Sequence, residues 1–148
     1  MLYLDTSFIA PLVLNEATSE EIETFVIRQP AEILAVSQWT RVEFASLVAR
    51  EVRMKNFTLQ IAGMVLEEFE ALINQSCQIW LPHAADYELA RKFVTNFESG
   101  LRGGDALHLA IAKNQGASLL LTLDESLLNA AGLFDIPASR GSVAGNQE

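Results

Sequence analysis

The chain has 148 residues, which is enough for one domain with a core of its own. Its 19 Asp and Glu residues outnumber its 10 Lys and Arg residues, and the formal net charge of −9 excludes the broad basic surface by which a protein binds nucleic acid unaided. Cys77 is the only cysteine, so an intrachain disulfide is excluded, and we expect a small buried apolar side chain in a reducing cytoplasm. The apolar run at 8–14 contains Pro11 and is far shorter than the ~20 residues of a membrane span, so neither a signal peptide nor a membrane helix is expected.

The first half of the chain alternates short apolar runs with segments of helical periodicity. Residues 2–4 and 32–37 predict buried strands, and residues 19–29 predict a helix. Ser37 is the expected cap of a further helix, which has a strongly apolar surface formed by Trp39, Val42, Phe44, Leu47 and Val48. Thr58 is the expected cap of a long helix over 58–75.

The second half continues the alternation. We predict a strand at 78–82 stopped by Pro82, helices over 84–97 and 105–116, and a strand over 117–124 whose continuous apolar run is typical of a parallel strand buried on both faces. Strands separated by helices imply right-handed crossovers. The predicted fold is therefore a three-layer α/β/α domain around a mainly parallel sheet, spanning residues 1–136. Residues 137–148 have little to bury and are predicted to form a mobile tail.

Two aspartates directly follow the predicted buried strands at 2–4 and 117–124. Asp5 comes after "LYL" and Asp124 after "LLLTL". Ligands of open parallel sheets collect outside the carboxyl ends of the strands, so the two carboxylates share one crevice if these strands are neighbours. The alternative is that each aspartate only caps the helix after its strand.

Two further acids lie in apolar surroundings. Glu43 lies within the apolar helical segment that follows Ser37, so an inward orientation is favoured over pairing with Arg41 or Arg50 at the rim. Asp105 follows two glycines and begins a helix. The alternative is that its negative charge only stabilises the helix by interacting with the positive end of the helix dipole. His108 shares that helix face and is interpreted as a packed histidine rather than a catalytic one.

The segments "LDTS", "SQWTRVEFASLVAR", "LRGGDALHLAIA" and "LTLDESLLNAAG" together resemble the four acidic motifs of the PIN domain in VapC-type toxins. The resemblance covers nearly the whole chain up to the C-terminal tail. It implies a metal-dependent ribonuclease with Asp5, Glu43, Asp105 and Asp124 as the catalytic and metal-binding acids. It also implies a supporting hydroxyl at Ser7, with Thr6 as a second candidate, and a cognate antitoxin as partner.

The chemistry of these residues agrees with that implication. Carboxylate oxygens are ligands suited to Mg²⁺ or Mn²⁺, which can polarise a scissile phosphate and reverse the local negative field. Four basic residues are the candidate RNA contacts, although they can equally form solvated surface: Arg50, Arg53, Lys55 and Arg102. The sequence thus predicts a magnesium- or manganese-dependent endoribonuclease, a hydrolase of RNA phosphodiester bonds. The alternative is a catalytically silent PIN-fold module that binds RNA or protein.

The two apolar helical segments at 39–48 and 58–73 carry more hydrophobic surface than one helix stripe needs. This favours a homodimer or a groove for a partner helix, with the antitoxin as the implied occupant. The alternative is that the two helices pack on each other within one domain.

Overall fold

A single parallel sheet forms the centre of the molecule, which is described by a computed structural model over residues 1–30 and 32–141. Its strand order is β3-β2-β1-β4-β5, and every neighbouring pair is parallel. This confirms the prediction of a mainly parallel sheet. The strands are β1 (Leu2–Leu4), β2 (Leu34–Ser37), β3 (Gln78–Trp80), β4 (Leu119–Leu121) and β5 (Ala138–Ser139).

A helix forms in each of the five segments for which the sequence predicts one, and two of these helices begin at the predicted caps Ser37 and Thr58. The Ser37 hydroxyl accepts a hydrogen bond from the Thr40 amide, and the Thr58 hydroxyl accepts one from the Ile61 amide at 3.1 Å. The helices are α1 (Thr6–Ile9), α2 (Ser19–Ile27), α3 (Gln38–Arg53), α4 (Leu59–Ser76), α5 (Ala84–Thr95), α6 (Gly103–Asn114) and α7 (Glu125–Leu133), with 3₁₀ turns η1 (Ala10–Leu12) and η2 (Phe97–Ser99).

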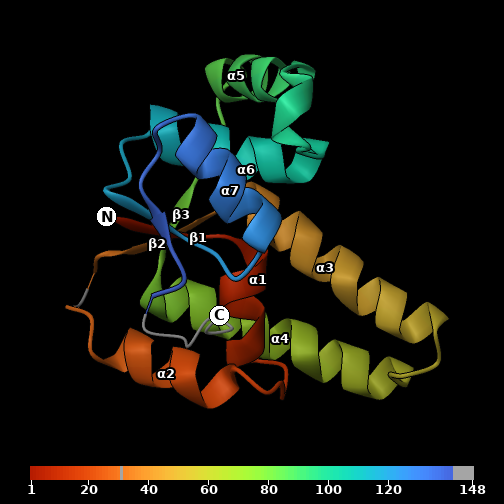
Figure 1. The fold of residues 1–148 in the computed structure, drawn as a ribbon. Coiled ribbons are helices and arrows are strands. Elements are labelled where there is room, and N and C mark those ends of the chain that lie inside the picture. The colour runs from red at the N-terminus through yellow and green to blue at the C-terminus, as the bar shows by residue number, and fades with distance from the viewer. Residues whose placement is uncertain (31, 142–148) are drawn as a thin grey trace.

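Helices cover both faces of the sheet, as Figure 1 shows. Successive strand residues alternate between two cores because side chains on a strand point to opposite faces. Tyr3 and Leu120 pack with α5, α6 and α7, whereas Leu4 and Leu121 pack with α1, α2, α3 and α4. The fold is therefore the three-layer α/β/α arrangement predicted from the sequence. The antiparallel pair α3 and α4 extends outward from the body of the domain (Figure 1).

The sheet continues past residue 136, where the sequence places the end of the domain. Ala138 and Ser139 form β5, and the Thr122 amide donates to the Ser139 carbonyl at 3.1 Å. The first residues assigned to the tail thus form an edge strand, because backbone pairing stabilises even a segment with few apolar side chains. The rest of the predicted tail, 142–148, lies outside the described residues. Within the part of the chain that the structure describes, no helix is long and apolar enough to cross a membrane.

Candidate active site

The carboxyl ends of β1 and β4 bring two of the four predicted acids together. These strands are neighbours, with Leu4 opposite Leu121, and the next helices begin after Asp5 and Asp124. One Asp5 carboxylate oxygen accepts from the Phe8 amide at 3.0 Å, and one Asp124 oxygen accepts from the Leu127 amide at 3.0 Å. Both sequence interpretations therefore hold at once, since each aspartate caps a helix and both face the crevice where the strand order reverses.

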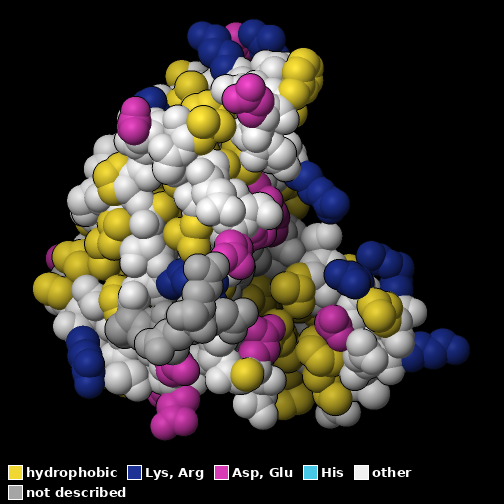
Figure 2. Space-filling view, in the orientation of Figure 1, with side chains coloured by type: hydrophobic (Ala, Val, Ile, Leu, Met, Phe, Trp, Pro, Cys, Tyr) yellow, Lys and Arg dark blue, Asp and Glu magenta, His cyan; other side chains and the backbone are white. Residues whose placement is uncertain are grey.

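All four predicted acids line one cavity of about 470 Å³. They come from four separate elements, because Glu43 lies on α3 and Asp105 in the first turn of α6. Figure 2 shows acidic side chains gathered in a hollow between α7 and α3. The residues that line the cavity are Asp5, Thr6, Ser7, Glu43, Leu47, Arg50, Asp105, His108 and Asp124.

Asp5 is the most buried of the four cavity acids, and hydroxyl groups hold both of its oxygens. Ser7 Oγ donates to Asp5 Oδ1 at 2.7 Å, and Thr122 Oγ1 donates to Oδ2 at 2.5 Å. Burial raises the pKa of Asp5, although these hydrogen bonds and the nearby His108 lower it. Thr122 was missed by the sequence analysis. A single hydroxyl within the apolar run "LLLTLD" is the signal that could have identified it.

Glu43 faces inward, as expected, and does not pair with Arg41. Thr6 Oγ1 donates to Glu43 Oε1 at 2.7 Å, and the same oxygen is hydrogen-bonded to His108 Nε2. Arg41 instead forms an ion pair with Glu70. Burial raises the pKa of Glu43, but the hydrogen bond and charge of His108 outweigh it, and the pKa lies below its usual value.

His108 is packed, as interpreted from the sequence, and it also reaches the cavity. Its side chain is 1% exposed, and its Nδ1 lies 2.7 Å from the Tyr3 hydroxyl. The sequence pattern showed only that His108 and Asp105 share a helix face. Its contact with Glu43 comes from the packing of α6 against α3, which sequence spacing does not reveal.

Asp105 is half-buried and is repelled by the other acids. Burial, followed by the negative charge of Asp124, raises the pKa of Asp105 to about 6, with smaller contributions from Glu43 and Asp5. Within residues 1–30 and 32–141, its carboxylate makes no hydrogen bond. A cation in the cavity would relieve this repulsion at Asp105.

The predicted RNA contacts do not all lie at the cavity. Arg50 lines it, whereas Arg53, Lys55 and Arg102 are exposed and lie outside its lining. Arg50 and Arg53 belong to the last turn of α3, and Arg102 directly precedes α6. Figure 2 shows basic side chains around the outer end of α3.

The donors at the cavity fit the chemistry of a divalent cation. Carboxylate oxygens are the ligands that Mg²⁺ and Mn²⁺ prefer, and the mutual repulsion of the acids at Asp105 is relieved by a positive charge. Among residues 1–30 and 32–141, however, no three His, Cys, Asp or Glu side chains already lie in a metal-binding arrangement. Metal binding would therefore require movement of a carboxylate that no hydrogen bond holds among the described residues, such as that of Asp105.

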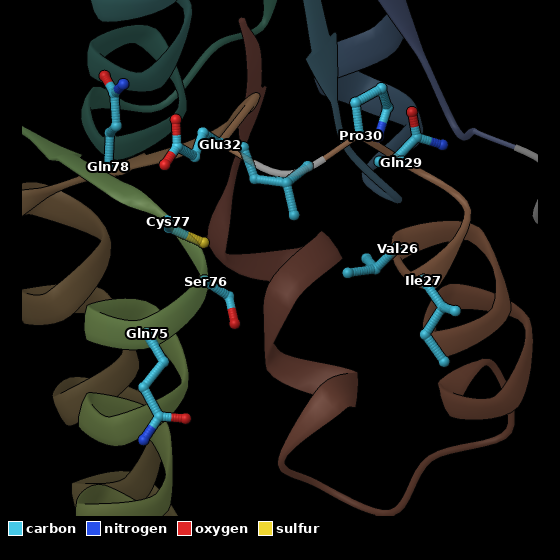
Figure 3. Close-up of a pocket in the computed structure, with 10 residues that line it drawn as sticks. Val26, Ile27, Gln29, Pro30, Glu32, Gln75, Ser76, Cys77 and Gln78 are labelled. Carbon is cyan, nitrogen blue, oxygen red and sulfur yellow. The ribbon is translucent and has the colours of Figure 1, made fainter.

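A second cavity, of about 810 Å³, lies at the opposite edge of the sheet (Figure 3). The ends of α2 and α4 enclose it beside the first residues of β2 and β3. Among the described residues, Glu32 is the one acid that lines it. Burial raises the pKa of the Cys77 thiol to about 11, so the thiol stays protonated at neutral pH. Cys77 packs against the apolar core, as expected. This cavity offers neither an acidic cluster nor a reactive nucleophile.

The fold and the cavity define a class of protein: an α/β/α domain with four carboxylates at the point where the strand order reverses. The family model of the PIN domain matches residues 2–133. The chain therefore belongs to the PIN domain family, in agreement with the resemblance seen in its motifs. No curated protein matches the sequence.

Solved structures share the fold at low sequence identity. VapC20 of Mycobacterium tuberculosis, described as a sarcin-ricin loop cleaving toxin, is 19% identical with a TM-score of 0.69, covering 88% of this chain and 95% of that one. FitAcB from Neisseria gonorrhoeae is 21% identical with a TM-score of 0.65, covering 93% and 96%. VapBC-1 from nontypeable Haemophilus influenzae is 17% identical with a TM-score of 0.68, covering 94% and 97%.

Proposed function

We propose that the protein is a metal-dependent endoribonuclease that hydrolyses RNA phosphodiester bonds. The observation that carries this proposal is the cavity at the carboxyl edge of the sheet, where carboxylates from four separate elements face one another. Burial, followed by the negative charge of Asp124, raises the pKa of Asp105, so keeping this acid ionised beside the others is unfavourable without a cation. Because this cluster destabilises the metal-free fold, its presence is better explained by a role in function than by a role in folding.

Asp5, Glu43, Asp105 and Asp124 are the residues that would hold Mg²⁺ or Mn²⁺. Such an ion supplies Lewis acidity toward a phosphate and activates water at neutral pH. Ser7 and Thr122 hold the two oxygens of Asp5, and Thr6 holds Oε1 of Glu43. Arg50 lines the same cavity, which supports it as a contact to an RNA phosphate.

The proposed biological role is that of the toxin in a toxin–antitoxin pair. Membership of the PIN domain family supports it, together with the shared fold of a VapC toxin and of VapBC and FitAB assemblies. The motifs resemble those of VapC-type toxins along nearly the whole chain. We therefore propose a cytoplasmic location and a cognate antitoxin as partner.

A homodimer is proposed from the apolar surface of α3 and α4. The two helices pack on each other within the domain, which was the alternative to a partner-binding surface. Large apolar side chains on both helices nevertheless remain exposed. Val42 is 57% exposed, Leu59 81% and Met64 63%. Exposed apolar side chains concentrated on one helix pair favour contact with another chain.

The deciding experiment incubates the purified protein with a panel of structured RNAs in chelator, in Mg²⁺ and in Mn²⁺. We expect cleavage by the wild type only with metal, and none by Asp5→Asn or Asp105→Asn. Glu67→Gln removes an exposed acid in the middle of α4 and serves as the control with full activity. RNA binding without cleavage under every metal condition would instead identify a catalytically silent module and refute the nuclease.

A further inference from the structure

One carboxylate oxygen of Glu43 is held by hydrogen bonds, and the other lies close to Gly104. Oε1 accepts from Thr6 Oγ1 at 2.7 Å and is hydrogen-bonded to His108 Nε2. Oε2 lies against the backbone of Gly104, where an added Cβ would come within 2.9 Å of it. A glycine at this point leaves the space that the carboxylate occupies. Contacts with Thr6, His108 and Gly104 therefore restrict the Glu43 side chain, which has three rotatable bonds.

A buried hydrogen-bonded chain extends behind this contact. His108 Nδ1 lies 2.7 Å from the Tyr3 hydroxyl, which donates to Ser37 Oγ at 2.9 Å. Ser37 in turn caps α3, the helix that carries Glu43. Tyr3, Ser37 and His108 are at most 1% exposed. The chain thus connects β1, the start of α3 and α6, and it fixes the imidazole ring whose other nitrogen contacts Glu43.

We infer that His108 is a positioning residue, oriented by Tyr3, that fixes the Glu43 carboxylate for divalent-cation binding. The inference rests on the proposed function, since it concerns the same four acids. A carboxylate that is already held in one position loses little conformational entropy when a cation binds. The cation is therefore bound more tightly than by a carboxylate that must first be ordered. Groups that orient ligand side chains typically contribute about 10–100-fold to metal affinity or activity.

Two substitutions of one residue separate positioning from packing. A Gln amide nitrogen can take the place of His Nε2, whereas an Asn amide nitrogen takes the place of Nδ1. His108→Gln therefore keeps the donor to Glu43, and His108→Asn keeps only the contact toward Tyr3. If the imidazole only filled core volume, the two variants would bind metal alike or in proportion to their stabilities.

The measurement is Mn²⁺ affinity of the intact chain by isothermal titration calorimetry, with melting temperatures recorded in chelator. We expect His108→Asn to weaken Mn²⁺ binding by about 10–100-fold. We expect His108→Gln to stay within about threefold of the wild type, because its amide supplies the N–H donor. The Mg²⁺ concentration that gives half-maximal RNA cleavage should shift in the same order.

Tyr3→Phe is the second variant, and it leaves every cavity-lining side chain intact. It removes the hydroxyl that holds His108 Nδ1 and that also donates to Ser37 Oγ. Loss of the contact to His108 should lower Mn²⁺ affinity by about 3–10-fold, the range expected for one hydrogen bond. This variant keeps the inference testable if both His108 variants fail to fold.

Three results would overturn the inference. One is equal Mn²⁺ affinity in His108→Asn, Tyr3→Phe and the wild type. Another is an equal loss in His108→Asn and His108→Gln. A third is tighter binding by His108→Asn, which would mean that His108 competes with the cation for Glu43. If the wild type binds Mn²⁺ and cleaves RNA, these results remove only the positioning role, whereas absence of Mn²⁺ binding in the wild type removes the proposed function as well.

Discussion

Replacing Asp105 by Asn should stabilise the metal-free protein. Asp105 is half-buried, makes no hydrogen bond to another described residue through its carboxylate, and is repelled by Asp124, Glu43 and Asp5. Asn keeps the shape of the side chain and removes the charge. A substitution that abolishes activity is thus expected to increase stability, because the acid is retained for binding a cation rather than for folding.

The size of the effect follows from the pKa. Asp105 titrates near 6 instead of 3.8, and a shift of about two pH units corresponds to ~3 kcal/mol between the two protonation states. Solvent screening at this half-buried carboxylate reduces the expected gain to about 1–2 kcal/mol. For a domain of this size, that gain raises the melting temperature by about 2–8 °C.

The sign of the pH dependence is fixed by the same shift. Because the folded-state pKa is above the unfolded value, this contribution to stability is fully present below pH 3.8 and is lost as the pH rises through about 6. In chelator, the wild type should therefore become more stable as the pH falls from 7.5 to 5. Asp105→Asn should lose that part of the pH response.

Thermal and denaturant unfolding in chelator, at matched ionic strength, test these expectations. Glu67→Gln is the control, since it removes an exposed acid from α4 and should change the unfolding free energy by less than about 0.5 kcal/mol. In the wild type, a divalent ion at 100 times its dissociation constant should add about 2.7 kcal/mol, and Asp105→Asn should reduce that gain. A destabilised Asp105→Asn with an unchanged metal response would refute the reasoning.

Four further outcomes are expected. Asp5→Asn should reduce RNA cleavage by more than the ~10–100-fold typical of residues that only orient a ligand, while circular dichroism stays native; wild-type activity would exclude Asp5 from the site. Thr122→Val should cost about 1–3 kcal/mol in urea unfolding, because the Asp5 carboxylate and the Asp124 amide each lose a partner; no loss would contradict the hydrogen-bond network. Arg50→Ala should remove about one phosphate contact, which changes the slope of the logarithm of RNA affinity against the logarithm of salt concentration by ~0.7. Lys113→Ala, in the last turn of α6 and outside the cavity lining, should leave that slope unchanged. Light scattering at micromolar concentrations should show a dimer, and a strict monomer would exclude it.

The sequence alone determined the elements and the edge of the sheet at which the acids lie. Apolar runs bounded by helix caps at Ser37 and Thr58 define the strands and helices, because burial and capping act locally. Aspartates directly after two buried strands must lie at the carboxyl edge of a parallel sheet. Asp5 and Asp124 were therefore placed correctly before any contact was known. The short β5 was not predicted, since its stabilisation comes from backbone pairing with β4 rather than from its side chains.

Only the tertiary structure decided which groups hold the acids. Thr122 is 117 residues from Asp5 and His108 is 65 residues from Glu43, so neither contact has a local signal in the chain. The same holds for the space beside Gly104, which exists because α3 packs against the first turn of α6. Hydrogen bonds have a reach of about 3 Å, and which side chains come within it depends on how the layers pack. Residue type and order thus fixed where the charges lie, and packing fixed how each charge is oriented.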